Sequence, residues 1–369
     1  MLGVSGVYNW TVFTAYIVFG VSHGMLVTWT QNEEKGYSYN ATAAVLHTEV
    51  LKLVMVFLLA RRSKSLSTLM QDVSKNIKVL MLYFIPAFLY AVYNSLSFLN
   101  LTYFDPLSYF VLMQLRVVLS GVIYQVLFRK ELSARQWFSL VLLAIGCMIK
   151  HVDSGALISA VDDSLDGEQS EGRVSRWLPS YRILLILLQL FCSTFAGVFT
   201  ELLLKRYAIK LDMWTHNIFM YVDSIVCGLF LFAASNQPVA KLLFLLDVGG
   251  DMAWQQQLKV AVVVVNMAAM GISTAVFLKS LNSIVKNFAN GLELVITALL
   301  TWLLFGIPIT KCTVVAMVLI LTAIHLYSTN PVKQTPIPLV KRKAKLSESA
   351  DSANGDYRLE REPHMSTSS

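Results

Sequence analysis

Ten apolar stretches, each close to the ~20 residues that one membrane-spanning helix needs, dominate this 369-residue sequence. In a bilayer, backbone polar groups must be satisfied within the chain, by helices or by a closed barrel. Barrel strands give a weaker, alternating signal, so we predict an all-α membrane protein with about ten transmembrane helices. The stretches are residues 8–28, 41–60, 79–101, 106–127, 134–150, 181–204, 214–235, 258–279, 284–305 and 310–328.

Composition agrees with this class and excludes others. The chain is 56% hydrophobic and 14% charged, against about 25% charged in soluble domains, and its mean hydropathy is +0.58. The net charge of +7 comes from residues in short loops and one tail, which membrane topology explains better than a nucleic-acid partner does. The sequence carries no Walker motif, metal-ligand spacing or nucleophile elbow. We therefore expect neither an enzyme nor an ATP-driven pump, and no metal or cofactor.

Basic residues predict the orientation of the chain. They cluster after the second, fourth and sixth stretches and in the tail, which all fall on one face of the predicted bundle, and the positive-inside rule makes that face cytoplasmic. An even number of helices then places both termini in the cytoplasm. The clustered residues are Arg61, Arg62, Lys64, Lys75, Lys78, Arg129, Lys130, Arg135, Lys205, Arg206, Lys210, Lys341, Arg342, Lys343 and Lys345.

A polar, acidic stretch at residues 153–178 divides the chain into two halves. We predict a first five-helix repeat at 1–152, a lumenal polar loop at 153–178 and a second five-helix repeat at 179–329. The remainder, 330–369, is rich in Pro, Ser and charge and is predicted to be a disordered cytoplasmic tail. Because each half has an odd number of helices, the second enters the membrane from the opposite side, which is the inverted-repeat plan of many secondary transporters.

Weak internal similarity supports the repeat. Leu127-Phe128 followed by Leu132-Ser133 in the first half matches Leu304-Phe305 followed by Ile309-Thr310 in the second. Apolar segments resemble one another by chance, so two short matches are suggestive only.

Three sequons contain Asn9, Asn40 and Asn100. Each lies at or near a predicted membrane boundary, which disfavours glycosylation.

Ionisable residues inside apolar stretches need a reason to be there, because a charge at a helix centre costs ~2.5 to 3.5 kcal/mol. Glu49 and Lys52, three residues apart on one predicted helix, are placed to pair, and Arg116 could pair with Glu293. Internal neutralisation is one interpretation of these residues, and substrate binding is the other. Lys286 lies near a predicted helix end, where snorkelling to the interface is an adequate alternative. Position alone makes Arg116 the strongest functional candidate.

Polar and aromatic residues accompany the cations in the apolar stretches. Each one is weak alone, since tyrosine is common in interfacial belts. Cations for phosphate, aromatic rings for stacking a base, and amide or hydroxyl groups for its edge together predict a nucleotide pocket at the repeat interface. The residues are Tyr90, Tyr93, Asn94, Tyr109, Gln114, Ser193, Asn217 and Tyr221.

Several ordered motifs resemble one known family. They are Thr48-Glu49-Val50-Leu51-Lys52-Leu53, the run PAFLYAVYN at 86–94, Asp105-Pro106, Gln114-Leu115-Arg116, Gln136-Trp137, Ala196-Gly197-Val198, Asn217 with Met220-Tyr221, and SIVKNFA at 283–289. On these motifs the chain resembles the nucleotide-sugar transporters of the CMP-sialate and UDP-galactose type, within the drug/metabolite transporter superfamily. The resemblance covers nearly the whole membrane region.

The resemblance implies roles for individual residues. Lys52, Arg116 and Lys286 would contact phosphate and ribose, with Tyr90, Asn94 and Tyr109 around them, and Ser193, Asn217 and Tyr221 would lie at the base. The sequence departs from the CMP-sialate members at Arg116, where they have Lys, at Tyr93, where they have Gln, and at Glu293, where they have a small apolar residue. The planar fork of Arg suits a diphosphate bidentately.

Within the family, the runs QLRVV and MYVDSIVC and the segment around Leu292-Glu293-Leu294 are similar to a UDP-galactose carrier. This implies a Golgi protein that exchanges UDP-galactose for UMP by alternating access. Three alternatives stay open: another nucleotide sugar such as UDP-N-acetylglucosamine or CMP-sialate, an exporter of small metabolites on the same fold, and a non-transporting membrane scaffold whose basic tail recruits partners. The sequence leaves sugar selectivity and a homo-oligomer undecided.

Overall fold

The structure is a computed structural model that describes residues 6–29, 41–104, 106–151, 181–208, 211–234, 254–306 and 309–330. These all belong to one compact unit, residues 1–333. The predicted lumenal loop at 153–178, the sequon residue Asn40 and the predicted tail after residue 330 lie outside the described residues.

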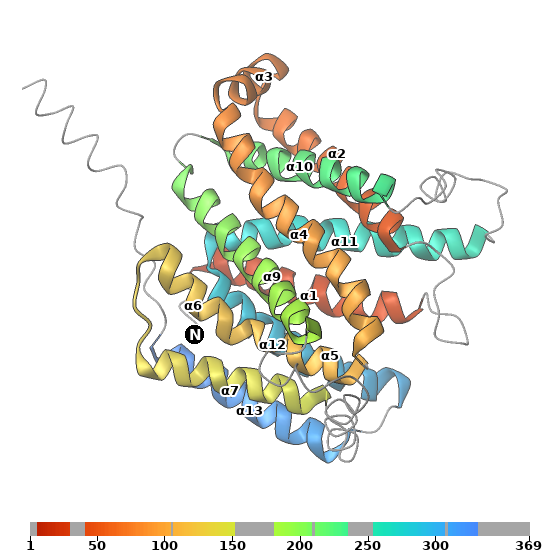
Figure 1. The fold of residues 1–369 in the computed structure, drawn as a ribbon, viewed down its shortest axis with the longest axis vertical. Helices are drawn as coiled ribbons and strands as arrows, with labels where there is room; N and C mark the ends of the chain where they lie inside the picture. Colours follow the sequence, from red (N-terminus) through yellow and green to blue (C-terminus); the bar gives the residue numbers. More distant parts are fainter. Residues whose placement is uncertain are drawn as a thin grey trace, which may run out of the picture. The chain divides into compact units, whose positions relative to one another are not determined.

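The described residues form helices and no strand (Figure 1). In the described part of the chain, eight segments are long and apolar enough to cross a membrane, namely α2, α4, the α5–α6 pair and α9 to α13, so the chain is a multi-pass membrane protein. The predicted spans 8–28 and 134–150 are helices, but they are not among these eight segments. The helices are α1 (Val7–Trp29), α2 (Ala41–Ser63), α3 (Leu66–Lys75), α4 (Ile77–Tyr103), α5 (Pro106–Met113), α6 (Arg116–Phe128), α7 (Ala134–His151), α9 (Tyr181–Arg206), α10 (Met213–Ala234), α11 (Trp254–Ser280), α12 (Ser283–Phe305) and α13 (Lys311–Thr329).

The helices differ from the predicted segments in two places. The fourth segment, 106–127, is two helices, because the backbone tightens to i→i+3 hydrogen bonds from Leu115 N to Leu112 O and from Val117 N to Gln114 O, both 3.0 Å. Hydropathy cannot reveal such a turn. The turn places Arg116 at the start of α6. The short helix α3 was not predicted, because its 10 residues are too few to span a bilayer.

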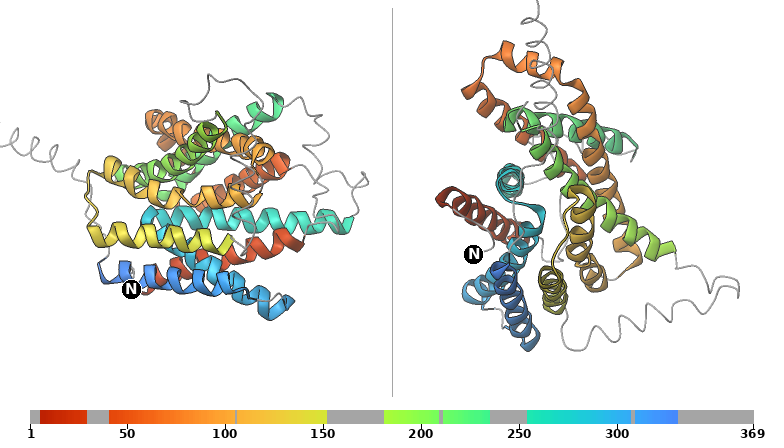
Figure 2. Two further views of the ribbon diagram at one scale, coloured as in Figure 1. Left: turned by 60° about the horizontal axis from the view of Figure 1, so that its bottom comes forward. Right: turned by 90° about the vertical axis from the view of Figure 1, so that its left-hand side faces the viewer.

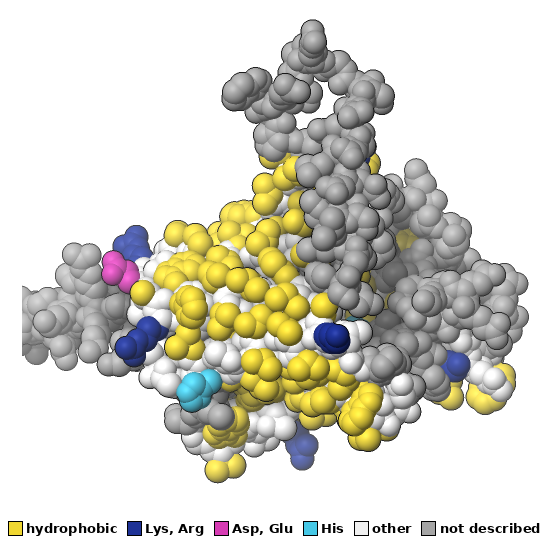
Figure 3. All heavy atoms as spheres, turned by 90° about the horizontal axis from the view of Figure 1, so that it is seen from below, with side chains coloured by type: hydrophobic (Ala, Val, Ile, Leu, Met, Phe, Trp, Pro, Cys, Tyr) yellow, Lys and Arg dark blue, Asp and Glu magenta, His cyan; other side chains and the backbone are white. Residues whose placement is uncertain are grey.

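Helix pairs distant in sequence pack side by side (Figures 1 and 2). Helix α7 lies along α13, α4 along α9, α1 along α11, and α10 along both α2 and α4. The largest hydrophobic cluster joins residues of α1, α6, α7, α11, α12 and α13, and includes Phe288 stacked on Tyr327 with ring centroids 4.4 Å apart. Seen from below, hydrophobic side chains cover most of the described surface and few charged ones are visible (Figure 3), as expected for a face in lipid.

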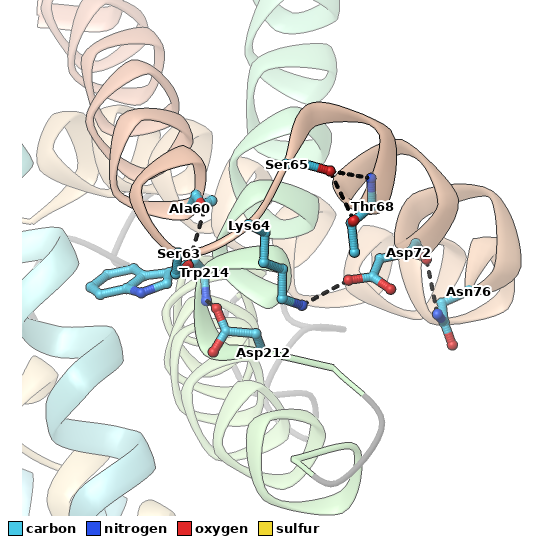
Figure 4. A network of polar contacts seen from close by, with 9 residues as sticks. All are labelled: Ala60, Ser63, Lys64, Ser65, Thr68, Asp72, Asn76, Asp212 and Trp214. Atoms are coloured by element: carbon cyan, nitrogen blue, oxygen red, sulfur yellow. Dashed lines mark hydrogen bonds and ion pairs between the residues drawn. The ribbon is translucent and has the colours of Figure 1, made fainter.

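A network of polar contacts lies at the end of α2 and along α3 (Figure 4). Ser65 caps α3 by accepting a hydrogen bond from the Thr68 amide at 3.3 Å, and Lys64 pairs with Asp72 at 2.7 Å. The link before α10 lies beside them, and its Asp212 accepts a hydrogen bond from the Trp214 amide. This end of α2 carries Arg61 and Arg62, two of the residues used to predict the cytoplasmic face.

The two links that match in sequence also match in backbone structure. Arg129 directly after α6 and Gly306 directly after α12 both adopt the left-handed conformation, with φ of 52° and 65°. The next helix is then capped by a hydroxyl, that of Ser133 or Thr310, which accepts a hydrogen bond from the amide three residues on, at 3.3 and 3.2 Å. The sequence similarity between the halves therefore extends to their turn and cap geometry.

Candidate functional site

Lys52 and Glu49 form the ion pair that their spacing predicts, at 2.5 Å on α2. The Lys52 ammonium also lies 5.0 Å from the centroid of the Tyr221 ring on α10. Gly271 of α11 provides space for its methylene chain, since a Cβ there would lie 2.7 Å from Lys52 Cδ. Lys52 is therefore held between α2, α10 and α11, with its charge neutralised inside the protein.

Lys286 points into the bundle. It lies in the first turn of α12, and its ammonium is 6.0 Å from the centroid of the Tyr16 ring on α1. One turn further along α12, Asn290 accepts a hydrogen bond from the Tyr16 hydroxyl at 2.7 Å. Lys286, Asn290 and Glu293 have the i, i+4, i+7 spacing of one helix face, and this face is turned toward α1. The Lys286 side chain therefore lies against α1 inside the bundle and does not reach toward the membrane interface.

Arg116 is the centre of a longer-range electrostatic cluster. It interacts electrostatically with Lys286 and Glu293 of α12, with Tyr93 of α4 and with Tyr16 of α1. The expected direct pair with Glu293 does not form: among the described residues neither Arg116 nor Lys286 has a carboxylate within 4.0 Å. Two cations inside the bundle thus keep their hydrogen-bond donors available for an anion.

One short contact fixes the two cations relative to each other. Asn287, next to Lys286, donates a 2.5 Å hydrogen bond to the hydroxyl of Ser120, one turn after Arg116. This bond ties α12 to α6. The spacing of Arg116 and Lys286 therefore depends on two helices from different halves of the chain.

Helix α10 contributes buried polar atoms that lack a partner. The side-chain amide nitrogen of Asn217 and the Tyr221 hydroxyl are buried, and neither makes a hydrogen bond with the part of the chain that the structure describes. Buried polar groups are rarely left unsatisfied. The two lie one turn apart on α10, and the ring of Tyr221 lies beside the Lys52 ammonium, so they indicate a position for a polar ligand. Both were predicted from the sequence to contact the base.

The other predicted site residues divide into two groups. Tyr90 interacts electrostatically with Glu49 and Tyr93, so it connects the Lys52 pair to the Arg116 cluster. Asn94 is exposed and Ser193 half-buried, and no described contact joins either to the cations.

Tyr109 uses its hydroxyl in a buried structural network. It donates to Ser97 at 3.3 Å and accepts from Gln189 at 2.7 Å, and Gln189 in turn accepts from Asn100 at 2.6 Å. This network joins α4, α5 and α9, so its hydrogen bonds hold the helices together.

A second buried cluster lies where α9 ends. Glu201 is fully buried, pairs with Lys205 at 2.7 Å and accepts a hydrogen bond from the Ser283 amide at 2.7 Å. The Lys205 ammonium also donates a hydrogen bond to the Leu281 carbonyl, which holds it inside the cluster. In the nearby α6–α7 link, burial lowers the pKa of Lys130 below its ordinary value and the Lys205 ammonium lowers it further, while Glu201 opposes them.

Sequence reasoning missed several residues of the site. Tyr16 and Asn290 join α1 to the Lys286 face, and Gly20 and Gly271 make room for Glu293 and Lys52. Asn290 could have been found from its spacing to Lys286. The glycines have no chemical signal of their own, because their role is the space beside another helix.

The chain belongs to the nucleotide-sugar transporter family, whose sequence model matches residues 7–328. It is 39% identical to the UDP-galactose transporter senju of Drosophila melanogaster over 88% of this chain and 87% of that protein. It is 25% identical to CMP-sialic acid transporter 1 of Arabidopsis thaliana, over 86% and 89%. A crystal structure with 12% sequence identity superimposes with a TM-score of 0.60, over 88% of this chain and 98% of that one, which is a likeness of fold alone.

Proposed function

We propose that this protein exchanges UDP-galactose for UMP across the Golgi membrane by alternating access. The observation that carries the proposal is the pair of cations Arg116 and Lys286, which lie inside the bundle without an ion-pair partner among the described residues. A cation inside the membrane without a contact partner is costly unless a ligand supplies one. The similarity to the senju transporter supports UDP-galactose before other sugars.

The site's polar groups suit the parts of such a nucleotide. The guanidinium and ammonium groups can bind the diphosphate, the guanidinium bidentately. The unpartnered side-chain amide of Asn217 and hydroxyl of Tyr221 can bind the edge of a base. Tyr90 interacts electrostatically with Glu49, the partner of Lys52, and with Tyr93 of the Arg116 cluster. We assign Lys52 to the same site, because its ammonium faces the Tyr221 ring.

Helix packing supports two inverted five-helix repeats. If α1, α2, α4, α5–α6 and α7 correspond in order to α9, α10, α11, α12 and α13, four observed pairings have a counterpart in which the halves are exchanged. The packing of α4 on α9 corresponds to that of α11 on α1, and the packing of α10 on α4 corresponds to that of α2 on α11. Likewise, the packing of α6 on α9 corresponds to that of α12 on α1, and the packing of α6 on α7 corresponds to that of α12 on α13. Such exchange symmetry is typical of transporters in which one half rocks against the other.

We place both termini in the cytoplasm. The end of α13 contacts the basic link after α6, because the Asn330 backbone carbonyl accepts a hydrogen bond from the Gln136 side chain at 2.8 Å and the Asn330 side-chain amide donates to the Ser133 hydroxyl at 3.0 Å. The chain after α13 therefore starts at the end of the bundle that carries Arg129 and Lys130, which the positive-inside rule assigns to the cytoplasm.

Uptake of labelled UDP-galactose, UDP-N-acetylglucosamine and CMP-sialate into proteoliposomes preloaded with UMP or CMP tests the proposal. We expect UMP-dependent uptake of UDP-galactose, lost in Arg116→Ala and Lys286→Ala, with folded yield unchanged. Lys311→Ala, at an exposed residue that begins α13, is the matched control and should keep full exchange. Preferred uptake of another nucleotide sugar would mean that UDP-galactose is not the main substrate. Normal exchange in both cation variants would overturn the assignment of Arg116 and Lys286 to the binding site.

A further inference from the structure

Glu293 is a carboxylate inside the proposed site that is close to two cations but bonded to neither. It lies on the α12 face of Lys286 and Asn290, and it packs against Gly20 of α1, where a Cβ would lie 2.5 Å from the Glu293 carboxyl carbon. The absence of a side chain at Gly20 is therefore what makes room for the carboxylate.

The ionisable groups that face Glu293 come from three helices. Among the described residues, Arg116 of α6, Lys286 of its own helix and Tyr16 of α1 interact with it electrostatically. Neither cation lies within 4.0 Å of a carboxylate. Lys52 differs, since its partner Glu49 is 2.5 Å away. In this site Lys52 is neutralised by a direct ion pair with Glu49. Arg116 and Lys286 interact with Glu293 only at longer range, which neutralises them in part.

We propose that Glu293 is an internal counter-ion that shares Arg116 and Lys286 with the phosphate groups of the substrate and thereby weakens substrate binding. This inference rests on the proposed function and assigns a further residue to the same site. Glu293 sets how tightly the nucleotide is held, and hence how readily it leaves.

The charge balance explains why a carboxylate is useful there. Counted as formal charges, Lys52, Arg116 and Lys286 against Glu49 and Glu293 leave a single net positive charge in the empty site. Without Glu293 the empty site would carry two, and a nucleotide with two negative charges would be held more strongly in a medium of low dielectric constant. An exchanger must bind its substrate and also release it, so a competing carboxylate in the site speeds release at the expense of affinity.

Among the described residues, Glu293 forms no contact ion pair with Arg116 or Lys286. A contact ion pair would occupy the guanidinium and ammonium donors, whereas a carboxylate farther away lowers the net charge and leaves those donors available to phosphate oxygens. Glu293 therefore reduces the attraction for an anion without blocking its hydrogen bonds.

The test is the pair Glu293→Gln and Glu293→Asp in the same exchange assay. Glu293→Gln keeps the shape against Gly20 but removes the charge, and we expect KM for UDP-galactose to fall about fivefold, equivalent to about 1 kcal/mol, with kcat also reduced because release is slower. Glu293→Asp keeps the charge and should stay near wild type. Glu131→Gln, at an exposed residue of the α6–α7 link, is the control for loss of an acidic residue.

The outcomes separate this inference from the proposed function. If the carboxylate only packs, Glu293→Gln would lower the maximal rate through loss of folded carrier and leave KM unchanged. Normal KM in Glu293→Gln would therefore overturn the counter-ion role while the exchange activity stands. Absence of exchange in the wild type would instead overturn the proposed function. If Glu293→Gln is not recovered folded, the double variant Gly20→Ala with Glu293→Ala fills the space without charge, and the same fall in KM is expected from it.

Discussion

The backbone amide of Ser283 donates a 2.7 Å hydrogen bond to the buried carboxylate of Glu201. The same carboxylate pairs with Lys205, and between these contacts Asn282 caps α12 by accepting a hydrogen bond from the Val285 amide at 2.8 Å. The end of α9 is thereby joined to the start of α12, three residues before Lys286. The geometry of the proposed phosphate site depends on this junction.

Replacing Glu201 should destabilise the protein strongly. Glu201→Ala leaves the Ser283 amide and the Lys205 ammonium without their buried partner, a change that typically costs ~3 to 5 kcal/mol. Unfolding in mixed detergent micelles measures the loss. The control is Asp72→Ala, which breaks the half-buried Lys64–Asp72 pair, worth ~0 to 1 kcal/mol. Equal losses in the two variants would contradict the importance of the junction.

A methyl group at Gly271 should impair exchange through Lys52. The Cβ of Gly271→Ala would lie 2.7 Å from Lys52 Cδ, so the lysine chain must move away from Tyr221. We expect UDP-galactose exchange to fall about tenfold, the effect of ~1.4 kcal/mol. Gly24→Ala is a matched glycine in α1 with no atom within 4 Å of the added Cβ, and it should exchange like wild type. A loss of activity in both variants would point to helix flexibility instead.

Asn100 should carry no glycan, although it begins a sequon. Its side chain is fully buried and its amide nitrogen, the atom that a glycan would modify, donates to Gln189 at 2.6 Å. We expect Asn100→Gln to leave electrophoretic mobility unchanged, with or without glycosidase, and to lower stability by ~1 to 3 kcal/mol by disturbing a buried polar network. A mobility shift that disappears in Asn100→Gln would show that this part of α4 is accessible.

The sequence predicts most of the fold because hydropathy and membrane thickness fix where helices can lie. Every predicted segment coincides with helix to within a few residues. The turn before Arg116 was not predicted, since Gln114 and Leu115 are compatible with a continuous helix and their i→i+3 bonds depend on tertiary packing. The same limit applies to the proposed repeats. Two short sequence matches suggest them, but the matching helix caps at Ser133 and Thr310 are visible only in the structure.

Contacts between residues of one helix could be predicted from the sequence, whereas contacts between residues of different helices could not. The Glu49–Lys52 pair follows from spacing along one helix. The partners of Lys286 do not, because Tyr16 lies 270 residues earlier and meets it only through the packing of α1 on α12. The expected Arg116–Glu293 pair was wrong as a direct contact for the same reason, since a sequence does not give the distance between two helices.

The contact between Gly20 and Glu293 can be tested independently of transport. Gly20→Ala places a methyl group 2.5 Å from the Glu293 carboxyl carbon, and such overpacking costs ~1 to 3 kcal/mol. Glu293→Ala leaves a gap that the same methyl group can fill. We therefore expect Gly20→Ala to destabilise the wild type but to be tolerated beside Glu293→Ala, with a coupling energy of ~0.5 to 3 kcal/mol in a double-mutant cycle of unfolding free energies. Additive losses would mean that the carboxylate does not lie against α1, and the counter-ion position would then be wrong as well.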